Sequence, residues 1–270
     1  MKKPKFNRKY FAFPYLALSI IFVIVPLVIL FWYSLTDMYG KFTFDNYVRF
    51  FTNQGGDVNV LLRSLWVAFL TTLGCFVLAY PLAYILAHKK LRMSAVIVLF
   101  FVLPIWINFM LRTYALKVLL GLFTDDPRGM TYVVIGLIYD FFPFMLLPLY
   151  TVLSNIDQSY IEASNDLGGN SVNTFLKVTL PLSIPGIVSG CIMVFMPTVS
   201  TFAINAFFGD TSTWLFGDTI SYDYGRGETG WHSGAALAFV MLIIVAASVA
   251  LTRKFSGSTK FDGKAGGTAV

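Results

Sequence analysis

Long apolar runs, each near the length of a membrane-spanning helix, alternate with short polar segments along the chain. About 20 apolar residues cross a bilayer, and backbone amides in lipid must be paired within their own segment, so each run predicts one helix. The runs cover residues 11–33, 64–87, 95–111, 132–153, 184–208 and 235–251. We therefore predict an all-α integral membrane protein with six transmembrane helices and both termini on one side.

Short tails flank the predicted transmembrane domain of residues 11–253: a basic tail of residues 1–10 and a flexible Gly- and Lys-containing tail of residues 254–270. The lysines ahead of the first run also suit a signal peptide. That run, however, exceeds the usual apolar length of about 7 to 15 residues, and no small-residue cleavage site follows it. We expect it to remain as the first transmembrane helix.

The composition supports a membrane protein, because 57% of the residues are hydrophobic and only 13% are charged, with a mean hydropathy of +0.71. An ordinary soluble domain has about 25% charged residues. Thirteen of the 20 lysines and arginines lie in residues 1–10, 88–94, 154–183 and 253–270. The positive-inside rule makes that side cytoplasmic. The basic balance therefore indicates contact with anionic lipid and gives no evidence for nucleic acid.

The longest polar interruption predicts two short helices joined by a sharp turn. Ile156, Tyr160, Ala163 and Leu167 recur at helical spacing, which gives the first helix an apolar stripe. Gly168-Gly169 is expected to end it, since glycine accepts the left-handed conformation that often follows a helix. Ser159 and Glu162 are a candidate capping box for this helix.

The second short helix is predicted to begin with Asn170 or Ser171 as its cap. Pro181 is expected to stop it, because the residue before a proline avoids helical geometry.

Fixed residue types at fixed separations across this region resemble the EAA loop of ABC importer permeases. The matching segments are Glu162-Ala163-Ser164, Asp166-Leu167-Gly168, Val178-Thr179-Leu180-Pro181-Leu182 and Pro185-Gly186-Ile187. Ser164 and Gly169 stand where that family commonly has alanine. We call residues 155–183 the coupling loop. The resemblance implies that it docks on an ATPase through Tyr160, Glu162, Ala163, Asp166, Leu167, Gly168 and Pro181.

Further segments are similar to spermidine/putrescine importer permeases. They are Thr43-Phe44-Asp45-Asn46-Tyr47, Pro104-Ile105-Trp106-Ile107-Asn108, Arg112-Thr113-Tyr114, Pro143-Phe144-Met145 and Pro148-Leu149-Tyr150. This resemblance implies a type I ABC importer in a prokaryotic plasma membrane. Its expected partners are a second homologous permease forming a heterodimer, two ATPase subunits and an extracytoplasmic binding protein.

No catalytic residue is predicted in the chain, and ATP and Mg²⁺ are expected on the ATPase subunits. Gly257 and Gly263-Lys264 superficially resemble a phosphate loop, but their spacing is wrong and Ala265 replaces the required hydroxyl residue. Cys75 and Cys191 fall within apolar runs, and the two histidines lack metal-ligand spacing, so no metal site is predicted.

Polar residues inside the apolar runs are the candidates for a solute path, since charged side chains are costly in lipid. Asp140 is the clearest, and a structural hydrogen bond between helices is its alternative role. Thr198, Thr201 and Asn205 are predicted to share one helical face, and Asn108 and Arg112 another. The proposed path residues are Trp106, Asn108, Tyr139, Asp140, Thr198, Thr201 and Asn205.

We expect a small organic cation such as a polyamine as the solute, because its ammonium groups can pair with a bare carboxylate at Asp140. Permeases of the same architecture also carry metals, oxyanions, phosphonates and sugars, which remain alternatives. A stand-alone secondary transporter is a further alternative, but it predicts repeated halves, and spans one to three show no repeat in spans four to six. Asp140 argues against a purely structural membrane scaffold.

Overall fold

The structure is a computed structural model that describes residues 12–52, 56–88, 93–210 and 212–256. Its elements are helical, and the one β-bridge within these residues joins Thr36 to Phe42. Five helices in the described ranges are long and apolar enough to cross a membrane, or six if a sharply bent pair counts as one span. The predicted all-α membrane fold is confirmed. The basic tail of residues 1–10 and most of the 88–94 turn and of the C-terminal tail lie outside the described residues.

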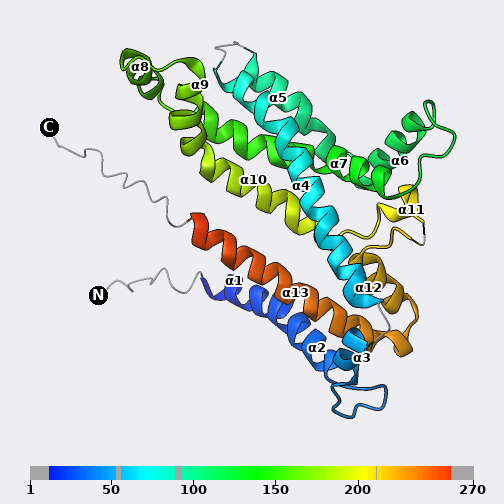
Figure 1. The fold of residues 1–270 in the computed structure, drawn as a ribbon. Helices are drawn as coiled ribbons and strands as arrows, with labels where there is room; N and C mark the ends of the chain where they lie inside the picture. Colours follow the sequence, from blue (N-terminus) through cyan, green and yellow to red (C-terminus); the bar gives the residue numbers. More distant parts are fainter. Residues whose placement is uncertain (1–11, 53–55, 89–92, 211, 257–270) are drawn as a thin grey trace, which may run out of the picture. The chain divides into compact units, whose positions relative to one another are not determined.

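Two compact units make up the chain, and we describe each by itself (Figure 1). The first unit combines residues 1–58 with 219–244, and the second combines 59–218 with 245–270. The helices are, in chain order, α1 (Ala12–Ser19), α2 (Val25–Ser34), α3 (Asp45–Thr52), α4 (Asp57–His88), α5 (Ser94–Val102), α6 (Phe109–Leu120), α7 (Met130–Ser154), α8 (Gln158–Asp166), α9 (Ser171–Thr174), α10 (Leu180–Ser200), α11 (Asn205–Phe208), α12 (Phe216–Gly225) and α13 (Glu228–Ser256).

In the first unit, α1, the π-helical turn η2 (Ile20–Ile24) and α2 form one span from Pro14 to Ser34. Phe31 of this span packs against Phe239 of α13, with 5.3 Å between ring centroids. The His232 ring of α13 stacks on Tyr33, and its Nδ1 lies 3.1 Å from the Tyr33 carbonyl oxygen. These contacts hold the end of α2 beside the start of α13.

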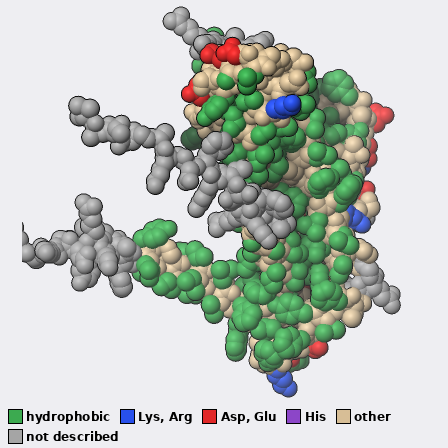
Figure 2. All heavy atoms as spheres, turned by 60° about the vertical axis from the view of Figure 1, so that its left-hand side comes forward, with side chains coloured by type: hydrophobic (Ala, Val, Ile, Leu, Met, Phe, Trp, Pro, Cys, Tyr) green, Lys and Arg blue, Asp and Glu red, His purple; other side chains and the backbone are tan. Residues whose placement is uncertain are grey.

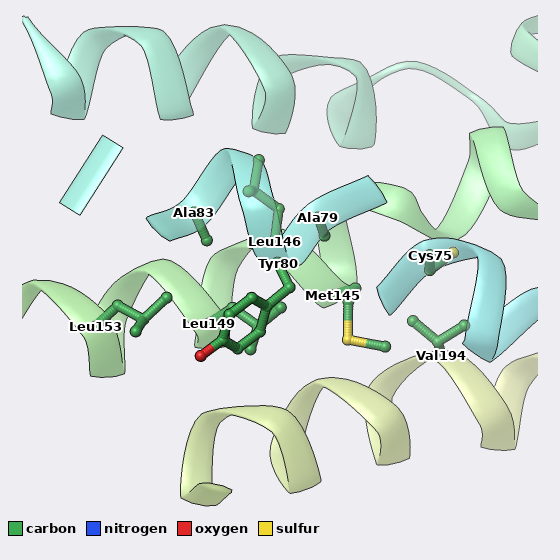
Figure 3. Close-up of a cluster of buried hydrophobic side chains, with 9 residues drawn as sticks. All are labelled: Cys75, Ala79, Tyr80, Ala83, Met145, Leu146, Leu149, Leu153 and Val194. Atoms are coloured by element: carbon green, nitrogen blue, oxygen red, sulfur yellow. The ribbon is translucent and has the colours of Figure 1, made fainter. Parts of the chain in front are cut away.

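The core of the second unit lies where α4, α7 and α10 meet (Figure 3). Small residues of α4, including Ala79 and Ala83, are fully buried against Met145 and Leu149 of α7. Gly190 of α10 packs so closely on α7 that an added Cβ would lie 2.6 Å from the Met145 sulfur. Small residues allow such close approach between membrane helices, where apolar burial itself gives little driving force.

The third apolar run is broken, so the prediction of one continuous helix over residues 95–111 is wrong. α5 leads into a 3-10 turn, η3 (Leu103–Trp106), and α6 then begins at Phe109 with a bend of 104° between the two parts. Pro104 lies in this turn, and the Asn108 side chain accepts hydrogen bonds from the amides of Met110 and Leu111. A proline beside a capping asparagine ends one helix and starts another.

The helix formed by the fifth run is also shorter than predicted, because α10 ends at Ser200 and does not continue to residue 208. Thr201 is extended, with ψ of 144°. A Cβ on Gly217 would lie 2.4 Å from the Thr201 carbonyl oxygen, so residues 201–217 fold back on themselves. Ile204 and Phe208 prolong the apolar run for a different reason: they are buried with Leu137 and Val133 of α7 in a second core cluster.

Hydrophobic side chains dominate the visible surface, with acidic and basic side chains confined to small groups (Figure 2). In the first span, none of the most apolar 18-residue window is buried inside the protein. Such a surface faces lipid or partner chains, since polar groups in the hydrocarbon region are costly.

Candidate functional site

Asp157 begins the coupling-loop helix α8, and its carboxylate accepts a hydrogen bond of 2.9 Å from the amide of Ser159. This hydrogen bond lowers the pKa of Asp157, because it stabilises the charged form. The predicted capping box of Ser159 and Glu162 is wrong, since the helix starts two residues earlier than that pairing requires.

The turn after α8 confirms the prediction that glycine ends this helix. Gly168 has a φ of +82°, the left-handed conformation that glycine adopts without strain. Gly169 is required for another reason: an added Cβ would lie 2.7 Å from the Ser164 carbonyl oxygen, which accepts a hydrogen bond from the Gly169 amide. Asn170, one of the two predicted caps, begins α9 by accepting a hydrogen bond of 2.8 Å from the Asn173 amide.

Pro181 does not stop the second helix, contrary to prediction. α9 passes through the π-helical turn η4 (Phe175–Thr179) into α10, and Leu180 before the proline is helical, with φ of −62° and ψ of −48°. The wider turn changes the hydrogen-bond register just before Pro181, which lies at the start of α10. A missing amide is tolerated in this continuous helix because local π-helical adjustments pair the backbone groups that a proline frees.

All the predicted ATPase-contacting residues are exposed. Leu167, at the tip of the turn, is 90% exposed, and no residue of α8 is buried. Tyr160 and Pro181 line a groove of about 480 Å³ with Ile156. The full exposed set is Tyr160, Glu162, Ala163, Asp166, Leu167, Gly168 and Pro181. Exposed apolar groups rimmed by carboxylates are typical of a partner-binding surface.

Asp140 is buried and ion-paired, so the expectation of a bare carboxylate is wrong. The Arg112 Nε donates to Asp140 Oδ1 at 2.7 Å, and the Thr113 hydroxyl donates to Oδ2 at 2.7 Å. Arg112 also donates to the backbone oxygens of Asp140, at 3.1 Å, and of Pro104, at 3.0 Å. One guanidinium therefore joins α6, α7 and the turn that breaks the third run.

The other proposed path residues do not share one surface. Thr198 is buried and donates to the Val194 carbonyl at 2.7 Å, Thr201 ends α10, and Asn205 lies in α11. The single helical face predicted for these three residues is therefore wrong. The Asn205 amide donates to the Thr213 carbonyl oxygen, at 3.0 Å, and to Asp218.

Aromatic path residues remain accessible on the second unit. Trp106 is 86% exposed and Tyr139 is 42% exposed. The Arg112 guanidinium lies 5.9 Å from the centre of the Tyr139 ring. Asn108 caps α6 and Arg112 lies within α6, so neither residue belongs to the helix α5.

Sequence reasoning missed Arg112 and Thr113 as the partners of Asp140. A usable signal was present, because charged residues within membrane segments are usually paired with one another. An arginine and an aspartate in successive apolar stretches fit that rule.

Known proteins resemble this chain along most of its length. The model of the binding-protein-dependent transport system inner membrane component family matches residues 9–256. The spermidine/putrescine transport system permease protein PotB of Escherichia coli K12 is 32% identical over 220 residues, which cover 76% of this chain and 79% of PotB. The protein of that name from Haemophilus influenzae is 28% identical over 249 residues, covering 84% and 86% of the two chains.

Two solved structures share the fold. A chain of the MetNI methionine ABC transporter in an inward-facing conformation has a TM-score of 0.61 at 20% identity, covering 74% of this chain and 94% of its own. A chain of a bacterial ABC transporter that imports the acidic polysaccharide alginate has a TM-score of 0.66 at 15% identity, covering 96% and 100%. Together with the family match, these findings show that the chain belongs to the inner-membrane permeases of binding-protein-dependent ABC transporters.

Proposed function

We propose that the chain is the permease subunit of an ATP-driven polyamine importer, with spermidine or putrescine as its solute. The coupling loop carries this proposal, because it presents an exposed apolar tip beside carboxylates, held by a left-handed glycine. The relatives named as spermidine/putrescine permeases support the solute class at 28% to 32% identity.

A binding-protein-dependent permease of this family works with an ATPase and a binding protein and is not itself the catalyst. In our proposal ATP and Mg²⁺ bind to two ATPase subunits, one of which contacts α8 and the turn at Gly168. A second, homologous permease forms a heterodimer with this chain. Both termini and residues 154–183 are cytoplasmic, as the distribution of lysine and arginine predicts.

Exposed aromatic rings supply the proposed solute contacts. A polyamine carries ammonium groups, and Trp106 and Tyr139 offer ring faces for cation-π attraction worth about 0.5 to 2 kcal/mol per contact. Such contacts are weak enough for the solute to leave again. Asn108, Thr201 and Asn205 keep some exposed surface and remain in the proposal as polar path residues, whereas Thr198 is fully buried and does not reach the solute. In this proposal Asp140 has a structural role, because its ion pair with Arg112 holds α6 against α7.

ATP-dependent uptake by the reconstituted complex tests this function. The chain is placed in liposomes with its sister permease, its ATPase and its binding protein, and labelled spermidine or putrescine is supplied outside. We expect uptake that requires internal ATP and is reduced by either unlabelled polyamine. Uptake of a sugar or an oxyanion in place of a polyamine would overturn the solute assignment. Uptake driven by an ion gradient without the ATPase would overturn the importer mechanism.

A further inference from the structure

Phe175 connects the coupling loop to the core of the second unit. It is the first residue of η4, and its ring makes edge contacts with Tyr80 and Tyr84 of α4, at centroid distances of 5.9 Å and 5.4 Å and interplanar angles of 85° and 89°. T-shaped pairs of this kind are favourable beyond the burial of their area. The preceding residue, Thr174, is buried, and its hydroxyl lies 2.9 Å from the Ser164 hydroxyl of α8.

Tyr80 continues this connection into α10. Its ring is buried among the apolar side chains drawn in Figure 3, and its hydroxyl lies 2.9 Å from the Ser183 hydroxyl. Ser183 in turn donates to the Leu180 carbonyl oxygen at 2.8 Å. A series of direct contacts therefore runs from α8, through Thr174 and Phe175, to Tyr80 and on to α10.

The π-helical turn η4 lies between the two ends of this series. The Thr179 hydroxyl in that turn is buried, and among the described residues it has no hydrogen-bond partner. π-helical turns are rare in proteins, and those that occur are often found at functional sites. At η4 the helix that joins the coupling loop to the membrane core departs from α-helical hydrogen bonding, so contacts made by side chains fix its direction there.

We infer that Phe175 is a positioning residue that transmits displacement of α8 to α4 and α10 during each transport cycle. Close-packed side chains have low compressibility and transmit strain, so a ring packed against two tyrosines moves with them. Without that ring, η4 absorbs the movement of α8 and the membrane helices do not follow. The inference rests on the proposed docking of the ATPase on α8.

The ratio of ATP hydrolysed to solute imported tests this role in the reconstituted complex. Phe175→Ala should raise the ratio several-fold while the ATPase still co-purifies, because the exposed residues of α8 are unchanged. Leu137→Ala is the matched control: it removes a buried α7 side chain from the second core cluster, which contains neither Phe175 nor Tyr80. It should lower the yield of complex and leave the ratio at the wild-type value. Tyr84→Phe, which keeps the ring, should also keep that ratio.

Phe175→Leu guards against a folding failure, since it retains most of the apolar volume while losing the ring edges. It should raise the ratio in the same direction as Phe175→Ala. A wild-type ratio in either assembled variant would overturn the role of Phe175 and leave the docking proposal intact. If the ATPase did not co-purify with the wild-type protein, that result would instead count against docking itself.

Discussion

The guanidinium of Arg112 and the carboxylate of Asp140 form an ion pair of 2.7 Å that is buried between α6 and α7. The same arginine satisfies the Pro104 carbonyl oxygen at the break between α5 and α6. A buried charge whose partner is removed destabilises a protein strongly, whereas replacing both partners by apolar groups is often neutral. The pair therefore fixes how the bent third span packs on α7.

Asp140→Asn should destabilise the assembled protein by about 3 to 5 kcal/mol, because the Arg112 charge is left buried without compensation. Thermal unfolding of the purified complex measures the loss. The double variant Arg112→Met/Asp140→Leu should recover part of the unfolding temperature, and polyamine uptake with it, because no charge is left buried but the Pro104 carbonyl oxygen loses its donor. A stable double variant without uptake would show that the charge itself acts on the solute.

Gly168→Asp should leave the protein in the membrane and abolish solute-stimulated ATP hydrolysis. The φ of +82° makes a side chain cost about 1 kcal/mol or more of strain, although the space around it is open. Gly40→Asp is the matched control, since Gly40 has a φ of +73° and equally open surroundings in a different turn. Equal stimulation in the two variants would contradict a specific role for the turn at Gly168.

The sequence-based predictions succeeded where a local rule decides the structure. Apolar run length predicted most spans, and the glycine after α8 predicted the turn. They failed where tertiary contacts decide. Ile204 and Phe208 continue an apolar run because they are buried in a core, and Asp140 gives no sign in its own segment that Arg112 reaches it. Pro181 misled because the preceding π-helical turn has no clear sequence signature.

Acid should weaken the start of α8. The hydrogen bond from Ser159 lowers the pKa of Asp157, so its stabilising contribution is present above the ordinary aspartate pKa of about 3.9 and is lost as the pH falls through the lowered value. Asp157→Asn keeps a capping side chain without a titrating group. Hydrogen-exchange protection of residues 158–166, compared between wild type and variant at each pH, should fall in acid only for the wild type. A parallel fall in both proteins would assign the effect to other groups.

Cysteine labelling tests the proposed orientation. In a background without Cys75 and Cys191, a cysteine is placed at Tyr39, which is 85% exposed, or at the exposed Asn170 of the coupling loop. An impermeant thiol reagent added to intact cells should label position 39 and not position 170. Labelling of position 170 alone would invert the topology.

Docking of the ATPase on the coupling loop is the central claim, and co-purification of the two proteins from detergent-solubilised membranes tests it most directly. Leu167→Asp places a charge on the most exposed apolar side chain of the loop without disturbing a buried contact. Met38→Asp makes the same kind of change at an exposed apolar residue beside Tyr39, which the proposed orientation places outside the cell. We predict that the ATPase is lost from the Leu167→Asp protein and retained by the Met38→Asp protein. Retention of the ATPase at wild-type levels by the Leu167→Asp protein would contradict the account.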